Sequence, residues 1–367
     1  MSMSNKDFSL EKTPVFHIDG GDLFTIAKEI HGDSFNPLSP FREQPGEVSK
    51  PSAEAMKLVQ DIEFKQMVEV LAQPSSKILL RRGGLNVPTE YASVYIKKTQ
   101  DKEKIVYLKN DHDTVSAFLF EHLDQYLAFF TTEFASMVTM LPVNLLSPAL
   151  PLRTTAFLFN LIDCYRRAYL SGMLALSTEL PEAIYEDEFI AVLEQGLKSG
   201  DVRWLVPSFF MLVPGLGESI LTFELSDLQK AEDLKFITRS TCPIENKPIY
   251  LFGSSAKYMG LEFTLFSKQA VGFEITALNA RQEVECIGRY YLAPTDEANH
   301  FFCVSTANGD VEVIHSALSL SGLEDKLRDI LGGRVTAGKK PAFCKNCGTK
   351  MLPDSAFCIR CGVKVQA

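Results

Sequence analysis

Two similar series of hydrophobic runs lie along the chain, and a helical middle separates them. In the first series, short runs rich in Val, Ile and Tyr alternate with charged or glycine-containing breaks, which is typical of antiparallel strands. These strand-like runs are Lys77–Leu80, Tyr91–Lys97 and Lys104–Lys109. Apolar residues then recur at a spacing of three and four, which predicts a long helix from about Asp113, its N-cap, to about Leu141.

The second series repeats this order closer to the C-terminus. Strand-like runs are predicted at Ile249–Phe252, Glu262–Phe266, Val271–Leu278, Glu283–Tyr291, Phe301–Thr306 and Val311–His315. The last two are joined by Ala307-Asn308-Gly309-Asp310, which is typical of a tight hairpin turn. A closing helix follows at about Leu318–Leu331. Between the two series, the hydrophobic periodicity predicts helices at Thr154–Ser177, Glu186–Gly200 and Val202–Val213.

The C-terminal segment contains one nine-residue pattern twice. Residues 342–350 and 356–364 both read Ala-Phe-Cys-x-x-Cys-Gly-x-Lys. Two residues between cysteines let both thiolates reach one ion from a single tight turn, and glycine adopts the positive φ that closes this turn. The four predicted ligands of one structural zinc ion are Cys344, Cys347, Cys358 and Cys361.

Four thiolates around zinc leave no coordination position open, so this ion would stabilise the segment and would not catalyse a reaction. The segment is too small to have a hydrophobic core, and metal binding would supply its folding free energy. Four cysteines also suit a rubredoxin-type iron site, which is the main alternative. The pattern over residues 342–365 resembles the compact double-knuckle zinc ribbons at the ends of many bacterial proteins.

Together these patterns predict an α+β fold with two similar antiparallel-sheet-plus-helix halves around a helical middle, followed by a small zinc ribbon. The N-terminal half would span residues 1–151, with its sheet at about 77–109 and its long helix at about 113–141. The helical middle and the second sheet with its closing helix would span 152–331. Residues 332–341 are polar and contain glycine, which indicates a linker before the ribbon at 342–367.

Charge divides the chain into two different parts. The 367 residues carry a net charge of −9, with 37 basic and 46 acidic side chains. Residues 334–367 hold seven of the basic and one of the acidic residues, so the remainder carries −15. With two negative charges from a Zn(Cys)4 centre, the net +6 of the tail becomes about +4. Such a tail suits an acidic protein surface or nucleic acid.

The remaining cysteines and the hydrophobic runs indicate a cytoplasmic protein. Cys164, Cys242, Cys286 and Cys303 are scattered, unlike a secreted disulfide framework, and we expect free thiols in a reducing compartment. No signal peptide is recognisable at the N-terminus, and no apolar run reaches the length of about 18 residues that a membrane span requires.

Catalytic patterns are not recognisable in the sequence. The six histidines show no pairing along the chain, and no nucleophile, base and orienting group can be matched to a known motif. We therefore expect no catalytic residue and no organic cofactor, although groups that are distant in sequence can still meet in a folded site.

The body resembles the EspG family, cytosolic chaperones of type VII (ESX) secretion. The stretches that carry the resemblance are Phe35–Leu38, Gly196–Asp201, and Phe273–Tyr291 continued through Phe301–His315 and Leu318–Leu331. The family does not typically end in a zinc ribbon, so this chain departs from its pattern there. The resemblance implies that the body binds a secreted helical substrate through its sheet surface or loops and performs no chemistry.

Three functional hypotheses follow from the sequence. The first is a non-enzymatic cytoplasmic adaptor or chaperone that binds a protein partner through a sheet face or an apolar groove. The second is a nucleic-acid-associated protein that uses the basic residues 334–367, with binding that weakens steeply as salt increases. The third is an enzyme whose site lies between the two halves.

Overall fold

The computed structural model describes most of the chain. The described residues are 13–42, 50–84, 87–99, 102–111, 114–140, 142–146, 149–216, 223–264, 270–307 and 310–332. The chain divides into two compact units, Met1–Leu323 and Glu324–Ala367. Only the end of helix α10 (Leu320–Leu331) and Gly332 are described in the second unit, so the architecture below is that of the first.

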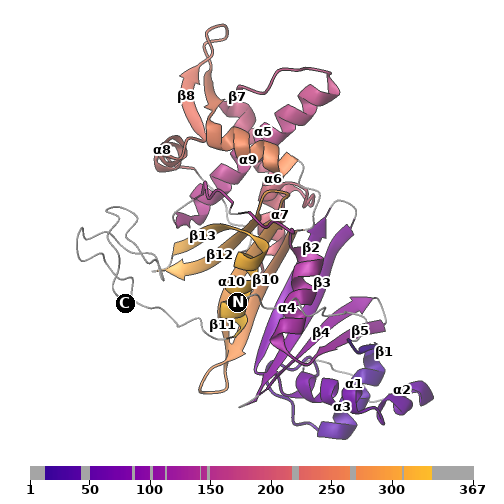
Figure 1. Cartoon of the computed structure of the whole chain (residues 1–367). Helices are drawn as coiled ribbons and strands as arrows, with labels where there is room; N and C mark the ends of the chain where they lie inside the picture. Colours follow the sequence, from indigo (N-terminus) through magenta and orange to yellow (C-terminus); the bar gives the residue numbers. More distant parts are fainter. Residues whose placement is uncertain are drawn as a thin grey trace. The chain divides into compact units, whose positions relative to one another are not determined.

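Within the described residues, one antiparallel sheet of ten strands dominates the first unit (Figure 1). Its order is β1-β5-β4-β3-β2-β10-β11-β12-β13-β6. The first five in chain order are β1 (Val15–Asp19), β2 (Ser76–Gly84), β3 (Val87–Lys98), β4 (Glu103–Asp111) and β5 (Thr114–Phe120). The others are β6 (Leu150–Pro151), β10 (Ala270–Leu278), β11 (Val284–Pro294), β12 (Asn299–Ala307) and β13 (Asp310–Leu318).

The two predicted halves are confirmed, and they share this one sheet. Strands β2 to β5 form one meander and β10 to β13 form the other, each followed along the chain by a helix. The meanders meet where β2 pairs with β10, with Ile78 opposite Ile275 and Leu80 opposite Phe273. The sheet therefore runs without interruption from one half into the other.

The predicted helix over residues 113–141 is wrong in its first third. Residues Thr114–Phe120 form strand β5, and the helix, α4, covers only Leu123–Phe134. Ala117 and Leu119 are buried under helices on one face of the sheet, while Phe120 is buried under α4 on the other. Because both faces of β5 are covered, its sequence lacks the alternation that identifies a half-exposed strand.

Helices cover the sheet unevenly. We call the side that carries Leu79 and Ser93 the first face and the side that carries Leu80 and Val94 the second face. Helices α1 (Gly20–His31), α2 (Ala53–Leu58) and α3 (Ile62–Ala72) lie on the first face over β1, β5 and β4. Helix α4 lies on the second face, where Phe130 contacts Phe273 at 5.9 Å between ring centroids. This contact links α4 of the first half to β10 of the second.

The helical middle packs on the first face at the other end of the sheet. Its helices are α5 (Leu152–Leu174), α6 (Glu186–Lys198), α7 (Leu205–Leu212), α8 (Leu225–Asp233) and α9 (Ser254–Thr264). Phe159 of α5 and Phe209 of α7 share a core with Phe302 of β12, with ring centroids 5.2 and 6.3 Å from that of Phe302. In the described part of the chain, no helix is both long and apolar enough to cross a membrane.

A small second sheet within this region differs from the prediction. Strands β7 (Ala183–Tyr185), β9 (Pro248–Phe252) and β8 (Ile237–Thr241) pair in that order. The predicted strand Ile249–Phe252 thus exists, but it belongs to this sheet. The predicted strand Glu262–Phe266 is wrong for its described residues, because Glu262 to Thr264 end helix α9. Phe263 of α9 is fully buried, and one turn of a buried helix resembles a strand in sequence.

The buried Asp163 carboxylate of α5 forms an ion pair within its own helix and also joins α5 to α7. The Asp163 carboxylate of α5 accepts hydrogen bonds from the backbone N–H groups of Leu205 and Val206 at 3.0 and 3.1 Å, which caps helix α7. Arg166 donates to the same carboxylate at 2.8 Å, with both side chains almost fully buried. The charge is thereby satisfied, and α7 is held in place above β10.

Helix α7 approaches the sheet so closely that Gly272 of β10 has no room for a side chain. A Cβ added at Gly272 would overlap the carbonyl group of Leu212. We expect Gly272→Ala to lower the free energy of unfolding by about 1–3 kcal/mol, because either α7 or β10 must shift. Gly200→Ala is the matched control, since a Cβ there meets nothing within 4 Å. Urea unfolding of both variants checks this, and equal midpoints would contradict the close packing.

Candidate functional site

The predicted zinc ligands lie outside the described residues. Cys344, Cys347, Cys358 and Cys361 all fall within residues 333–367. In the part of the chain that the structure describes, no group of three or more His, Cys, Asp or Glu side chains could hold a metal ion. The zinc site therefore stays a prediction from the cysteine spacing, and the candidate site described below belongs to the body.

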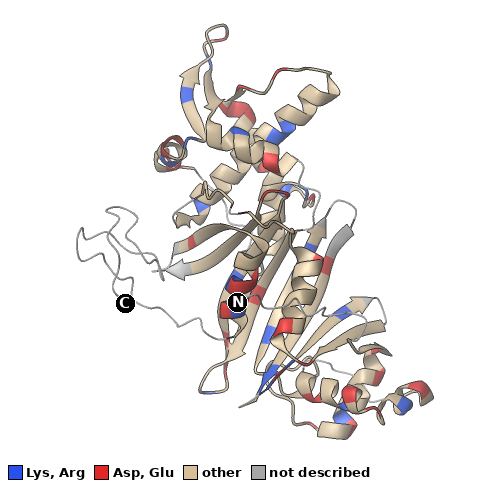
Figure 2. Ribbon diagram, viewed as in Figure 1, with Lys and Arg blue, Asp and Glu red and all other residues tan. Residues whose placement is uncertain are grey.

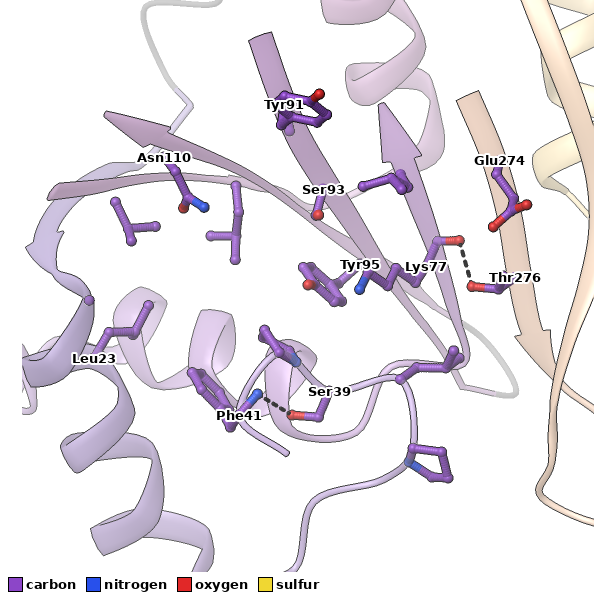
Figure 3. A pocket seen from close by; sticks show the side chains of 18 of the residues that line it. Leu23, Ser39, Phe41, Lys77, Tyr91, Ser93, Tyr95, Asn110, Glu274 and Thr276 are labelled. Atoms are coloured by element: carbon purple, nitrogen blue, oxygen red, sulfur yellow. Dashed lines mark hydrogen bonds between the residues drawn. The ribbon is translucent and has the colours of Figure 1, made fainter. Parts of the chain in front are cut away.

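A groove of about 510 Å³ crosses the first face near the centre of the sheet (Figure 3). Strands β2, β3 and β10 form its floor, and we call it the central groove. One wall consists of Leu23 of α1 and the loop Pro37–Phe41. The groove exists because α1 to α3 cover only one end of the first face and the helical middle covers the other. The strands at the junction of the two halves thus keep an open stretch.

The floor alternates between apolar and polar side chains. Tyr91, Ser93 and Tyr95 lie along one side of β3 and point into the groove (Figure 3). Tyr91 is 56% exposed, whereas Tyr95 is buried against helix α3 and its neighbours. Leu79 on β2 and Thr276 on β10 continue the floor toward the second half. An exposed aromatic ring on a rigid strand is a side chain that could anchor a partner protein.

Charged groups lie on both sides of this floor. The Lys77 ammonium lies 5.7 Å from the centre of the Tyr95 ring, and no described carboxylate forms an ion pair with it. Glu274 faces the same groove, but Arg289 holds its carboxylate at 2.7 Å. Arg81, further along β2, lies over the Tyr91 ring at 5.8 Å and donates to the carbonyl of Met211. A ligand in the groove would therefore meet the Lys77 ammonium without having to displace an ion-pair partner on these strands.

Hydrogen bonds hold the wall of the central groove in place. The Asn36 side chain donates to the carbonyl of Pro74 at 2.6 Å and accepts from the backbone of Leu38 at 3.0 Å. Ser39 accepts from the backbone of Phe41 at 3.3 Å. Leu38 and Phe41 are themselves buried. The wall is therefore a packed loop, and a ligand would find the groove already formed.

A second polar cluster was missed by sequence reasoning. The His300 ring bonds to Glu262 Oε1 through Nε2 at 2.7 Å and to His315 Nε2 through Nδ1 at 2.9 Å. Both rings are buried. The expectation that the histidines show no pairing is therefore wrong, because β12 pairs with β13 and places His300 diagonal to His315. The hairpin turn at Ala307–Asp310 was visible in the sequence and could have predicted this proximity.

Burial controls the protonation of this cluster. Desolvation, together with the neighbouring His300, holds the pKa of His315 well below its ordinary value. Burial alone would raise the pKa of Glu262, but hydrogen bonds from His300 and Thr295 and the charge of His300 outweigh it, so that this pKa is lowered. His315 Nδ1 has no hydrogen-bond partner among the described groups. A neutral His315 beside an ionised Glu262 is the arrangement that these contacts favour.

Three comparisons with known proteins bear on these sites. A family model for a zinc-ribbon domain matches residues 343–365, which indicates a zinc-binding domain at the C-terminus. No curated protein matches the chain significantly. Among solved structures, the chain is similar to one in the Mycobacterium tuberculosis type VII secretion system chaperone EspG5 in complex with the PE25–PPE41 dimer. That match has 8% identity and a TM-score of 0.42, and it covers 87% of this chain and 96% of the other.

Acidification should destabilise the body through His315. Its pKa in the folded state lies below its value in the unfolded state, so the unfolded chain binds the extra proton first. The free energy of unfolding should fall as pH decreases below about 6.5, by up to about 1.4 kcal/mol per pH unit. In His315→Gln this slope should be smaller. Urea unfolding at pH 8 separates any packing loss from titration, and parallel slopes below pH 6.5 would contradict the assignment.

Zinc content tests the ribbon directly. We expect the purified chain to carry about one zinc ion, and Cys344→Ser to lose most of it, because three thiolates leave the tetrahedral site incomplete. Cys286→Ser, at an exposed free cysteine of the body, is the matched control and should keep the metal. Metal analysis by mass spectrometry checks both. Iron in place of zinc, or an unchanged zinc content in Cys344→Ser, would refute the predicted site.

Proposed function

We propose that this chain is a non-enzymatic adaptor or chaperone whose central groove binds an amphipathic helix of a partner protein. The observation that carries the proposal is the open stretch at the junction of the two halves. There the floor strands β2 and β3 leave Leu79 and Tyr91 partly exposed in a groove with a fixed wall. Partner helices bind grooves of this kind through residues spaced three and four apart.

The chemistry of the floor supports this kind of partner. Tyr91 offers a large ring that is still 56% exposed, and Leu79 and Val284 contribute further apolar surface to the lining of the groove. Lys77 would meet an acidic side chain on the polar edge of the incoming helix. A helix with an apolar stripe and one carboxylate therefore complements the groove in both shape and charge.

The groups that line the groove support binding more than catalysis. Lys77 and Glu274 are the charged groups among its lining residues, and Arg289 already neutralises Glu274. No histidine or cysteine is among the described residues that line it. We also propose a cytoplasmic location, which suits the scattered cysteines of the body, since Cys164, Cys242, Cys286 and Cys303 form no disulfide among the described residues. The zinc ribbon would add a separate, structurally stabilised contact element.

Co-purification from the native host tests the proposal. A tagged wild-type chain should retain a protein partner, and Tyr91→Ser should retain about tenfold less of it, because the variant removes a central aromatic anchor. Ile62→Ser is the matched control, since Ile62 is 71% exposed but lies on α3 outside the central groove. Quantitative mass spectrometry compares the three samples. Equal retention by Tyr91→Ser, or turnover of a small molecule without any retained protein, would refute it.

A further inference from the structure

Strand β2 carries two cations on the first face, one on each side of Leu79. The register places Lys77 opposite Tyr95, Leu79 opposite Ser93 and Arg81 opposite Tyr91. A strand rises about 3.3 Å per residue, so the backbones of Lys77 and Arg81 are roughly 13 Å apart. The central groove and its continuation along β2 therefore have an apolar centre with a cation at each end.

Each cation is held against a tyrosine ring of β3. The Lys77 ammonium lies 5.7 Å from the centre of the Tyr95 ring, and the Arg81 guanidinium lies 5.8 Å from that of Tyr91. Neither cation forms an ion pair with a described carboxylate. A side chain that already rests on a ring loses less rotamer freedom when it pairs with a ligand. Both cations are thus positioned for an anionic partner.

The guanidinium of Arg81 has donors left for a ligand. Its Nη1 donates to the carbonyl of Met211 at 3.2 Å, which holds the group beside the end of helix α7. The other N–H groups of this guanidinium donate to no described acceptor. A guanidinium has five N–H donors, and pairs of them match the two oxygens of a carboxylate. A carboxylate at this end of the groove would therefore meet a donor that is already oriented.

The local charge is opposite to that of the body. On the first face around Leu79, the charged residues of β2, β3, β10 and β11 are Lys77, Arg81, Arg289 and Glu274. Glu274 lies opposite Leu79, and Arg289 already binds its carboxylate at 2.7 Å. Three cations and one carboxylate give a net +2, whereas residues 1–333 as a whole carry −15. Charge complementarity therefore selects an acidic ligand here.

The pairing of β2 decides which backbone conformation suits that ligand. Strand β2 pairs with β3 on one side and with β10 on the other, so it offers no free edge to an extended peptide. A helix satisfies its own backbone hydrogen bonds and can lie on the face of the strands. With a rise of about 1.5 Å per residue, roughly eight residues of helix span the distance between the two cations. Positions seven or eight residues apart also return to one face of a helix.

We propose that the central groove selects a partner helix with two acidic side chains seven or eight residues apart, which pair with Lys77 and Arg81. Apolar residues between them pack on Leu79 and Tyr91. This inference rests on the function proposed above. It adds the axis of the helix, which follows β2, and a second acidic anchor for Arg81.

Fluorescence anisotropy with the full-length chain tests the proposal. The probe is a fluorescein-labelled, alanine-based helical peptide of about 18 residues, with glutamates seven positions apart and two leucines between them. One twin has glutamines in place of the glutamates, and the other has its glutamates only four positions apart. We expect the probe to bind about tenfold more tightly than the glutamine twin and about threefold more tightly than the other, because each pair contributes about threefold.

The peptides separate this inference from the proposed function. If all three bind equally and Tyr91→Ser weakens each of them, the groove binds helices but the two acidic anchors are wrong. If none of them binds, both the anchors and the helix-binding groove are overturned. If a 15-nucleotide oligothymidylate displaces the probe as well as unlabelled peptide does, the two cations bind phosphates, and the partner helix is wrong.

Matched variants locate the two anchors. Lys77→Gln and Arg81→Gln should each weaken the probe about threefold and leave the glutamine twin unchanged, which also shows that the groove is intact. Lys57→Gln is the control, since Lys57 is an exposed lysine on α2 outside the groove, and it should change neither peptide. Full preference for the probe in either Lys77→Gln or Arg81→Gln would overturn the proposal.

Discussion

The pairing of β2 with β10 is the interaction on which the rest of the first unit depends. It joins two meanders that are about 190 residues apart in sequence, with Ser76 opposite Ala277 at one end and Gly83 opposite Ala270 at the other. A four-stranded meander alone would expose one strand edge at this position, and an exposed edge is prone to non-specific pairing. Each meander covers the edge of the other. The register also places Leu80 against Phe273, so the core under α4 continues across the junction.

The same junction explains why the sheet has an open face at its centre. Each half brings its own helices to the first face: α1 to α3 come from the N-terminal part, and α7 and α9 come from the helical middle. Neither group extends over the full width of the sheet. Strands β2, β3 and β10 consequently carry buried residues on the second face, such as Ile78, and leave partly exposed ones on the first, such as Leu79 and Tyr91. A groove of this kind follows from building one sheet out of two smaller units.

The charged side chains of the body do not follow the arrangement of its hydrophobic side chains. Basic and acidic side chains are interspersed over the helices and strands (Figure 2). The excess of acidic residues in the body therefore has a local effect only where several of them face one cavity. Such a place is the cavity between the end of α4, helix α9 and the β11–β12 turn, because Glu262, Asp296 and Glu297 line it without a lysine or arginine among its described lining residues. The central groove differs, because Lys77 and the neutralised Glu274 leave it weakly basic.

Much of the fold could be predicted from the sequence, because the meander strands β2, β3, β4, β10, β11, β12 and β13 carry local signals. Alternating residues and turn chemistry are properties of neighbours in sequence, and they located these strands within a few residues. The failures have two physical causes. Strand β5 is buried on both faces, so its apolar residues do not alternate, and the run that begins at Glu262 includes only the last turn of helix α9, which is too short to show a helical period. Which face is buried is decided by elements that are distant in sequence.

The candidate sites differ in predictability for the same reason. The four ribbon cysteines are close in sequence, and the geometry of one metal ion dictates their spacing. The central groove and the His300–His315 pair depend on contacts between strands, so their residues are not grouped along the chain. The contact of Glu262 with His300 requires a helix where the sequence predicted a strand. A site can be located from sequence alone only when its residues are assembled by local geometry, and the predicted zinc ligands meet that condition whereas the described sites of the body do not.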